Sequence, residues 1–450
     1  MLKVVITGGP GGGKTESMSV LTQELEERGY KVFFVPETAT ELILNGICPG
    51  TNISMEDFQK FVIKKQLSKE VLYDEASTYY DMDRVVIFYD RGLMDNAAYV
   101  SKPVFEKLLK EQNLSFTDVY ARYDAVVHLV TAANGAVEFY QWNDPTKEET
   151  GNNAARSESP EEAIIKDEKT LNAWVGHPHL RVFDNSTDFK GKIQRVVNEV
   201  FALLGEPVPK EIERKFLIKK PTQEEIEALG YMSKTNIIQT YLRRKNPDVE
   251  RRVRQRGSKE DGFSFYYTEK TDLTDGERLE KEEKITPAEY IAYLSEANTL
   301  LHQVSKTRYC FIYENQYFEL DVYPFSNEYA IIEIELNDIN DEIHFPPLTF
   351  VKEVTNEADF KNCNLAKNLR FNVENVLTDD DFDWTYETGE VELEILGSGC
   401  RYYNVEKSKD KEKIFAIAKE SPRNYLTRYR KENGVTVYQQ WDGYSKSWIY

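Results

Sequence analysis

Up to about residue 205, the chain alternates unbroken apolar runs with stretches of helical spacing. Unbroken apolar runs are typical of strands buried on both faces of a parallel sheet, and the spaced stretches are typical of helices that cover it. The predicted strands are Val4–Ile6, Lys31–Val35, Arg84–Asp90, Ala125–Val130 and Leu180–Phe183, and the predicted helices are Glu16–Arg28, Met55–Tyr80 and Gly191–Leu204. We therefore predict an α/β domain with a parallel sheet over residues 1–205.

A second pattern runs from residue 210 to about 371, where the predicted strands carry a charge at every second position. Side chains alternate between the two faces of a strand, so each set of charges shares one face. The sets are Glu211, Glu213 and Lys215; Arg252, Arg254 and Arg256; Arg278, Glu280 and Glu282; Lys306 and Arg308; Glu319 and Asp321; and Glu333 and Glu335. The opposite faces are mostly apolar in the later strands. We predict an α+β domain with an antiparallel sheet that has one charged face.

A sheet face with charges of both signs cannot be buried without water, because the desolvation of unpaired ions costs free energy. Such a face therefore indicates a solvent-filled cavity for an ionic ligand. Carboxylates suit divalent metals with oxygen ligands, and lysines and arginines suit phosphate, so a metal-bound polyphosphate fits both. The alternative is a set of solvated faces with cross-strand ion pairs.

The remaining residues, 384–450, predict a small β-rich module that follows an acidic linker at Asp379–Asp383. Glu390–Leu396 alternates as a strand does, and Thr427–Gln440 is typical of a hairpin that turns at Asn433-Gly434. A structural extension, a partner-binding surface and a lid over the second domain all fit this module.

The composition narrows the possible partners. A chain of 450 residues with 40% hydrophobic residues predicts two or three packed domains, and a net charge of −20 leads us to expect no nucleic-acid partner. The four cysteines are scattered, which favours neither zinc nor a disulfide framework. No apolar run has the length of a transmembrane segment, and the chain opens on a strand without a signal peptide, so we expect a cytoplasmic protein.

The first candidate site is a glycine-rich loop that fits G-x-x-x-x-G-K-[ST]. It consists of Gly8, Gly9, Pro10, Gly11, Gly12, Gly13, Lys14 and Thr15. In this motif backbone N–H groups surround phosphate oxygens, the lysine reaches the β- and γ-phosphates, and the threonine hydroxyl ligates Mg²⁺. We expect ATP or GTP here, with Mg²⁺ or Mn²⁺. A glycine-rich turn with a chance lysine is the alternative.

Residues at the ends of the next predicted strands extend this site. Glu37 follows one strand, and Asp90-Arg91-Gly92 follows another. The second segment resembles the D-R-G segment of nucleoside and nucleotide kinases, which implies that Asp90 helps to hold the metal and that Arg91 faces phosphate. Asp90 could instead cap the next helix.

Two loops complete the predicted first site. The polar stretch Tyr140–Ser159 is typical either of a lid that delivers Arg156 to the phosphates or of a plain solvated loop. Asn185 lies in the loop Asp184–Thr187, at a place where P-loop proteins often contact the base.

The second domain resembles the CYTH superfamily, the triphosphate tunnel metalloenzymes. Glu211-Ile-Glu-Arg-Lys215 matches the E-x-E-x-K opening of that family, and Gln239–Leu242, Thr268–Lys270 and the charged sets follow in the family's order. The resemblance implies an eight-stranded antiparallel tunnel. It implies that the metal ligands are Glu211, Glu213, Glu333 and Glu335, and that the phosphate ligands are Lys215, Arg252, Arg254, Lys270, Lys306 and Arg308, with Lys215 also a candidate catalytic residue. The stretch between Gln239 and Arg252 leaves the choice among Arg243, Arg244, Arg251 and Arg252 open.

The order of the two domains is similar to that of the TRPL translocation defect proteins and their bacterial relatives, over residues 1 to about 371. This similarity implies purine nucleotide binding. The residues predict phosphoanhydride hydrolysis or phosphoryl transfer. A protein of another class also fits: a nucleotide-regulated protein that binds a phosphorylated ligand, such as a phospholipid headgroup, without turning it over. The sequence indicates no particular protein partner.

Overall fold

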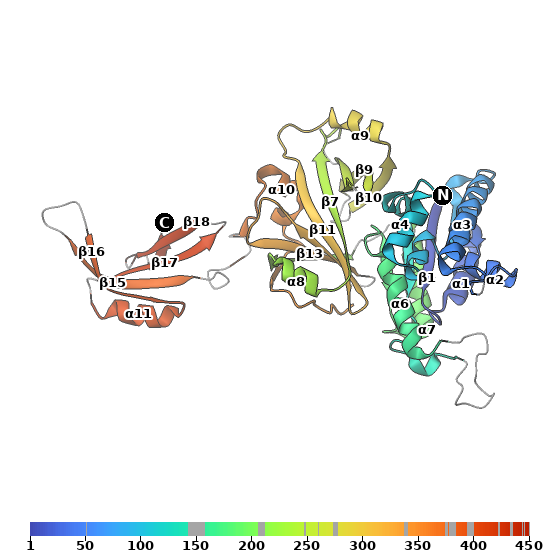
Figure 1. Ribbon diagram of the computed structural model, residues 1–450. Helices are drawn as coiled ribbons and strands as arrows, with labels where there is room; N and C mark the ends of the chain where they lie inside the picture. Colours follow the sequence, from blue (N-terminus) through green and yellow to red (C-terminus); the bar gives the residue numbers. More distant parts are fainter. Residues whose placement is uncertain are drawn as a thin grey trace.

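The fold is taken from a computed structural model of the chain. It describes residues 1–50, 52–142, 158–205, 212–246, 249–259, 261–272, 278–336, 341–373, 377, 384–393, 400–421, 424–432, 435–442, 444 and 446–449. Figure 1 shows three sheets that follow one another along the molecule, in the order of the chain.

The first sheet is parallel and has the strand order β2-β3-β1-β4-β5. Its strands are β1 (Leu2–Gly8), β2 (Lys31–Val35), β3 (Val85–Asp90), β4 (Ala125–Leu129) and β5 (Leu180–Phe183). The helices are α1 (Lys14–Glu27), α2 (Thr38–Leu44), α3 (Met55–Ser77), α4 (Lys102–Lys110), α5 (Phe116–Tyr120), α6 (Pro160–Trp174) and α7 (Phe189–Leu203), with 3₁₀ turns η1 (Met82–Arg84), η2 (Leu93–Ala98) and η3 (Val137–Phe139). The predicted α/β fold of this domain is confirmed.

Strand β3 explains why the sequence predicts this sheet well. Val86 and Phe88 pack into a core with α1 and α7, whereas Val85 and Ile87 pack into a second core with α3, α4 and α6. Successive side chains of β3 therefore pack against helices on opposite faces of the sheet. Because both faces are covered, the strand is apolar at every position of the run.

The second sheet is antiparallel and has the order β10-β9-β8-β7-β11-β12-β13-β6-β14. Its strands are β6 (Ile212–Lys219), β7 (Met232–Tyr241), β8 (Val249–Ser258), β9 (Gly262–Asp272), β10 (Arg278–Ile285), β11 (Val304–Tyr313), β12 (Gln316–Val322), β13 (Tyr329–Leu336) and β14 (Phe350–Glu353). The antiparallel, CYTH-like fold is confirmed, but over the described residues the sheet has nine strands and not the predicted eight. The additional strand, β14, has only four residues and lacks the charge alternation of the others.

The two faces of the second sheet differ as predicted. The outer face is apolar, and α8 (Gln223–Ala228) and α9 (Pro287–Leu294) pack on it through Ile226 and Tyr290. The inner face, here called the charged face, carries the alternating charged residues. At one end it becomes an apolar cluster, covered by η5 (Ala358–Phe360) and α10 (Asn362–Asn368).

The third sheet is also antiparallel, with the order β16-β15-β17-β18-β19. It contains β15 (Thr385–Leu393), β16 (Cys400–Ser408), β17 (Asn424–Glu432), β18 (Val435–Asp442) and β19 (Ser447–Ile449), and α11 (Lys411–Lys419) packs against it. The antiparallel pairing of β17 with β18, from Thr427 with Gln440 to Glu432 with Val435, confirms the predicted hairpin. Its predicted turn, Asn433-Gly434, lies outside the described residues. Helix α11 was not predicted.

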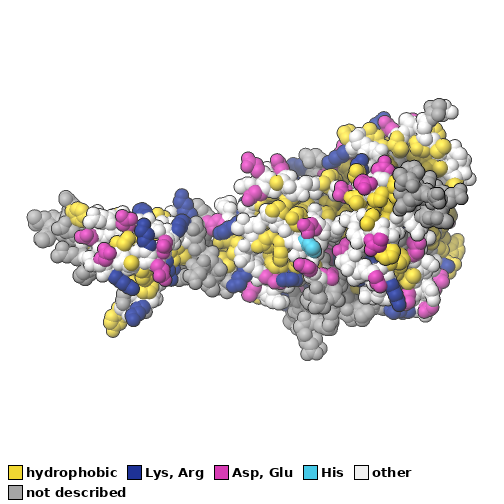
Figure 2. Space-filling model, turned by 90° about the horizontal axis from the view of Figure 1, so that it is seen from below, with side chains coloured by type: hydrophobic (Ala, Val, Ile, Leu, Met, Phe, Trp, Pro, Cys, Tyr) yellow, Lys and Arg dark blue, Asp and Glu magenta, His cyan; other side chains and the backbone are white. Residues whose placement is uncertain are grey.

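The surface charge is mixed. On the face shown in Figure 2, lysines and arginines are interspersed with aspartates and glutamates and do not gather in one patch. Recognition of a polyanion on the described part of that face would therefore need a local site.

Candidate functional site

The P-loop connects the carboxyl end of β1 to the first turn of α1. Gly13 caps α1 in a left-handed conformation (φ 88°), and Lys14 is the first helical residue. The loop lies against β4 so closely that a β-carbon at Gly8 or Gly12 would collide with the carbonyl oxygen of Leu129. Glycine is thus required by the packing of this loop as well as by its backbone conformation.

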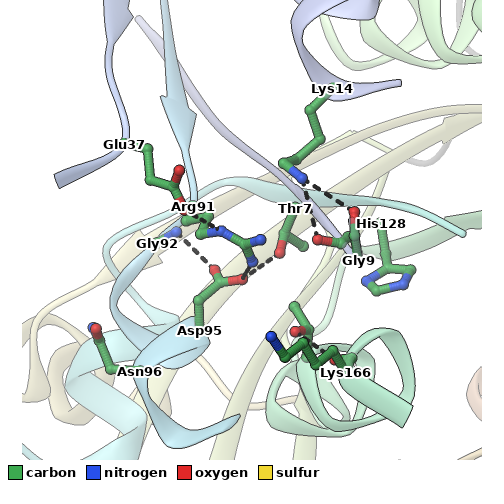
Figure 3. A network of polar contacts seen from close by, with 12 residues as sticks. Thr7, Gly9, Lys14, Glu37, Arg91, Gly92, Asp95, Asn96, His128 and Lys166 are labelled. Atoms are coloured by element: carbon green, nitrogen blue, oxygen red, sulfur yellow. Dashed lines mark hydrogen bonds and ion pairs between the residues drawn. The ribbon is translucent and has the colours of Figure 1, made fainter. Parts of the chain in front are cut away.

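Lys14 folds back over the loop. Its Nζ lies 3.3 Å from the carbonyl oxygens of both Gly8 and Gly9 (Figure 3). Burial and the positive charge of Arg91 together lower the pKa of Lys14 to about 8, against the opposite effect of Asp90. A bound polyphosphate would supply the counter-charge that this ammonium group lacks.

Asp90 ends β3, next to β1, and its surroundings show whether it fits the predicted role of a metal ligand. Burial raises the pKa of its carboxyl group to about 6, and the nearby Glu37 adds to this effect. Its Oδ1 is buried and has no hydrogen-bond partner among the described residues. An unsatisfied carboxylate oxygen beside a P-loop fits a hard divalent cation or its bound water. Thr15, the other predicted ligand, is exposed at the start of α1.

Arg91 is held by two carboxylates. Its backbone is left-handed (φ 68°), its Nε donates to Glu37 Oε1 (2.6 Å), and its Nη1 donates to Asp95 Oδ1 (3.2 Å). Burial raises the pKa of Glu37, but Arg91 and the hydroxyl of Thr40 outweigh it, so the net shift is downward. The prediction that Glu37 and Arg91 lie beside Lys14 and Asp90 agrees with this network; their catalytic roles stay predictions.

Asp95 and Asp167 are two further polar centres, and no role was predicted for either of them. Asp95 accepts hydrogen bonds from the backbone N–H of Gly92 (2.8 Å), from the indole N–H of Trp174 (3.1 Å) and from the hydroxyl of Thr7. The buried carboxylate therefore fixes the turn that follows Asp90.

Asp167, on α6, holds the P-loop from the other side. It accepts from the backbone N–H of Gly9 (2.5 Å) and of Thr131 (3.3 Å), and it contacts His128 Nε2 (3.1 Å). Only its buried position on an amphipathic helix could have indicated it, and that signal is shared by ordinary core residues.

Arg156 and Asn185 are the residues predicted to contact the phosphates and the base. Arg156 lies outside the described residues. Asn185 is described, but its side-chain amide donates to the carbonyl oxygens of Thr131 (2.8 Å) and Asn134 (2.6 Å), and its Oδ1 accepts from Lys192 (2.9 Å). The polar atoms of Asn185 thus hold the loop together, and its contact with a base stays a prediction.

On the charged face, the predicted phosphate ligands of β6 and β11 form one ion-pair network with carboxylates. Lys215 pairs with Glu333 (2.8 Å), and Arg308 reaches both Glu333 (2.7 Å) and Asp321 (2.6 Å). Lys306 also pairs with Asp321, and Arg308 with Glu319. Lys306, Asp321 and Glu333 are buried. Burial alone would raise the pKa of Glu333, but Lys215, Lys306 and Arg308 hold it well below its ordinary value.

The strands β8 to β10 carry the rest of the basic residues. Arg254 lies 3.7 Å from Glu282, and its buried Nε has no hydrogen-bond partner among the described residues. Burial tends to raise the pKa of Glu282, yet Arg254 and Arg252 lower it to about 2. Arg252 is buried on the same strand, and Lys270 is half-buried on β9. The unsatisfied guanidinium N–H can donate to a phosphate oxygen.

The predicted metal ligands of the second domain are only partly brought together. Glu213 and Glu335 are cross-strand neighbours, and Glu333 faces Lys215 in the adjacent register position. Glu211 lies outside the described residues. Glu335 pairs with Arg181 of the first domain (2.5 Å), which the sequence did not predict. Within the described ranges, no three carboxylate, imidazole or thiolate side chains are gathered as a metal site.

The geometry thus defines a P-loop α/β domain followed by an antiparallel domain with a charged face. Comparison with known proteins agrees: residues 3–192 match the family model described as an AAA domain, and residues 209–361 match that of the CYTH domain. The chain combines an AAA domain with a CYTH domain. These domain classes support nucleotide and triphosphate binding. No curated protein matches the chain.

Several solved structures are similar to part of the chain. The inorganic triphosphatase NE1496 is 27% identical, covers 35% of this chain and 95% of its own, and has a TM-score of 0.26. Thymidylate kinase from Ehrlichia chaffeensis is 16% identical, covers 45% of this chain and 98% of its own, and has a TM-score of 0.30. The adenylyl cyclase-like protein HpAC1 from Hippeastrum is 15% identical and covers 28% of this chain and 80% of its own, with a TM-score of 0.20. None of the described helices is both long and apolar enough to cross a membrane.

Proposed function

We propose that the first domain binds ATP or GTP at the P-loop and hydrolyses it or transfers its terminal phosphate. The observation that carries this proposal is the unsatisfied, buried Oδ1 of Asp90 in the same polar cluster as Lys14 and Arg91. A buried carboxylate oxygen without a hydrogen-bond partner costs stability, and a bound cation would offset that cost.

The roles of the residues follow from their positions. Lys14 would leave the carbonyl oxygens of Gly8 and Gly9 and neutralise the β- and γ-phosphates, while the loop N–H groups orient them. Arg91, held by Glu37 and Asp95, would place its free donors on the transferred phosphate. Mg²⁺ or Mn²⁺, when bound by Asp90 and Thr15, supplies electrostatic stabilisation of the charge on the phosphates.

We further propose that the charged face of the second domain binds a triphosphate or another phosphorylated ligand. Arg254 has an unsatisfied donor, and Lys215 and Arg308 can exchange carboxylates for phosphate oxygens. Glu213 and Glu335, with Glu211, would hold Mg²⁺ or Mn²⁺ beside the ligand. Hydrolysis in this domain, with Lys215 as a candidate catalytic residue, is part of this proposal.

A regulatory function is the second candidate. It is favoured by the Arg181–Glu335 ion pair, because a residue of the P-loop domain there occupies a carboxylate of the charged face. In this case nucleotide at the P-loop would control binding of the phosphorylated ligand without its turnover.

Release of phosphate from ATP, GTP and tripolyphosphate, each measured with EDTA, Mg²⁺ and Mn²⁺, separates the two candidates. Enzymatic function requires sustained, metal-dependent release from at least one substrate. If calorimetry detects binding while no phosphate is released, the regulatory candidate holds.

We also propose that residues 1–205, 210–371 and 384–450 are separate domains, because each contains its own sheet and core. Limited proteolysis should therefore cut first near residues 206–210 and 374–383. A cytoplasmic location, which the scattered cysteines favour, belongs to the same proposal.

A further inference from the structure

Residues Gly176–Arg181 of the first domain, here called the end segment, lie across one end of the charged face. The carbonyl oxygen of Gly176 accepts a hydrogen bond from Arg256 Nη2 on β8 (2.6 Å). Gly176 has φ 108°, and a β-carbon there would collide with the hydroxyl of Ser233 on β7. Glycine therefore lets the end segment lie directly against two strands of the second sheet.

The end segment contacts two further strands. The hydroxyl of Tyr317 on β12 donates to the carbonyl oxygen of His177 (3.3 Å), and Arg181 pairs with Glu335 on β13 (2.5 Å). Tyr317 and Glu335 lie on the charged side of their strands, as Arg256 and Ser233 do, because they share the alternation of the charged residues. Four strands thus meet the same segment through the same face.

The other end of the charged face is closed by the second domain itself. Apolar side chains of the same alternation, including Leu217, Val304 and Ile331, pack there beneath Phe360 and Leu365. Between the two ends, the arginines of β8 occupy positions 252, 254 and 256. At about 3.3 Å per residue, this row is about 13 Å long.

We infer that the charged face is a closed-ended site for a short phosphate chain, whose terminal phosphate lies against Arg181 and His179 of the first domain. The inference rests on the proposed function of the second domain. A triphosphate would lie between the apolar end and the end segment. A long polyphosphate would have to pass the end segment, which lines a cavity of about 750 Å³ together with Arg256.

The charged and polar groups of the end segment can bind a terminal phosphate. Arg181 also pairs with Glu199 (3.0 Å), so its guanidinium is held at the end of the site from the first domain. Burial lowers the pKa of His179 to about 4, with Arg181, Arg254 and Arg256 adding to this effect and Glu282 opposing it. A neutral imidazole can donate a hydrogen bond to a phosphate oxygen, and an anion there would offset the surrounding positive charge.

The test uses the full chain in EDTA and compares tripolyphosphate with a polyphosphate of some tens of units by calorimetric titration. Wild type should bind tripolyphosphate more tightly per chain. Arg181→Gln should weaken tripolyphosphate binding roughly tenfold, as expected for the loss of a charge-assisted hydrogen bond, and should leave long-chain binding unchanged or stronger. Gly176→Ala, which changes no charge, should favour the long chain by displacing the end segment.

Arg214→Gln is the matched control, because Arg214 pairs with Glu353 away from the charged face and the charge change is the same. It should alter neither affinity. If Arg181→Gln lowers the melting temperature, the double variant with Glu335→Gln removes the carboxylate left unpaired, and the loss of tripolyphosphate binding should persist in it. Equal wild-type affinities per chain that neither variant changes would overturn the inference alone. Absence of tripolyphosphate binding in wild type would overturn the proposed function of the second domain as well.

Discussion

The indole N–H of Trp174 donates to Asp95 Oδ2 (3.1 Å), and this hydrogen bond joins the P-loop site to the junction of the two domains. Asp95 also binds Arg91, whereas Trp174 ends α6 two residues before Gly176, at the start of the end segment. Arg91 is therefore connected through Asp95 and Trp174 to the end segment, which contacts the charged face. A movement of the Arg91 side chain on nucleotide binding would act on these connected residues.

Lys14→Ala should abolish nucleotide binding at the first domain and leave the fold intact. The side chain is not part of a described hydrophobic core, and among the described residues its ammonium group donates to the carbonyl oxygens of Gly8 and Gly9. Titration with a fluorescent nucleotide analogue measures the affinity, and Lys110→Ala, at an exposed site on α4, serves as the control. Unchanged affinity would rule out the P-loop assignment.

Asp90→Asn should lower turnover more than nucleotide affinity, because the phosphates keep Lys14 and the loop amides. The carboxyl pKa of about 6 predicts that wild-type turnover rises with pH through about 6, as the carboxylate becomes able to bind the metal. A pH profile of phosphate release tests this, and a variant that loses affinity and turnover equally would contradict it.

The same substitution should affect stability in the opposite direction. Because the folded-state pKa of Asp90 is raised, the native state holds its proton more tightly, and the stability contribution falls as pH rises from about 4 to 6. In the absence of metal and nucleotide, Asp90→Asn should therefore melt at a higher temperature than wild type at pH 7.5, with a smaller difference near pH 4. A large loss of melting temperature at pH 7.5 would instead make Asp90 a structural cap.

Glu333→Gln should destabilise the second domain by about 3 kcal/mol, since it removes a buried counter-ion of the half-buried Lys215 and Arg308. Wild-type Glu333, whose pKa is depressed, should stabilise the fold above its ordinary pKa of 4.5 and lose this effect as the pH falls below it. Tripolyphosphate should restore more stability to Glu333→Gln than to wild type, because phosphate replaces the missing carboxylate. Thermal melts with and without tripolyphosphate measure both effects.

Replacing Glu211 and Glu213 together by glutamine should reduce divalent-dependent triphosphate hydrolysis by orders of magnitude. Binding of tripolyphosphate in EDTA should persist or tighten, because the double variant removes two negative charges, and one of them, on Glu213, lies 3.6 Å from Lys215. Glu353→Gln on β14, where Glu353 pairs with Arg214, removes a carboxylate away from the charged face and is the control. A destabilised double variant with unaltered metal dependence would end the proposal of metal chemistry in this domain.

The sequence predicted most of the two large folds because their patterns are local. The apolar run of β3 and the alternating charges of β8 each reflect the surroundings of the two faces of a single strand. Both patterns can therefore be recognised in the sequence without knowing which elements the strand contacts. Short helices such as α5, and α11 in the third module, were missed because few residues carry their periodicity.

The features of the candidate sites can also be divided into those that the sequence predicts and those that only the structure shows. By itself the sequence determined the P-loop with Lys14, because phosphate binding requires glycines and a lysine at fixed spacing, and it placed Asp90 at the end of a buried strand. Only the tertiary structure decided that this strand, β3, lies next to β1. Only the tertiary structure decided that Asp167 holds the loop, that Glu333 is already paired with Lys215 and Arg308, and that Arg181 reaches Glu335 from another domain. Ion pairs between distant segments leave no periodic trace in the chain, since their strength depends on burial and distance, which the packing of the two domains sets.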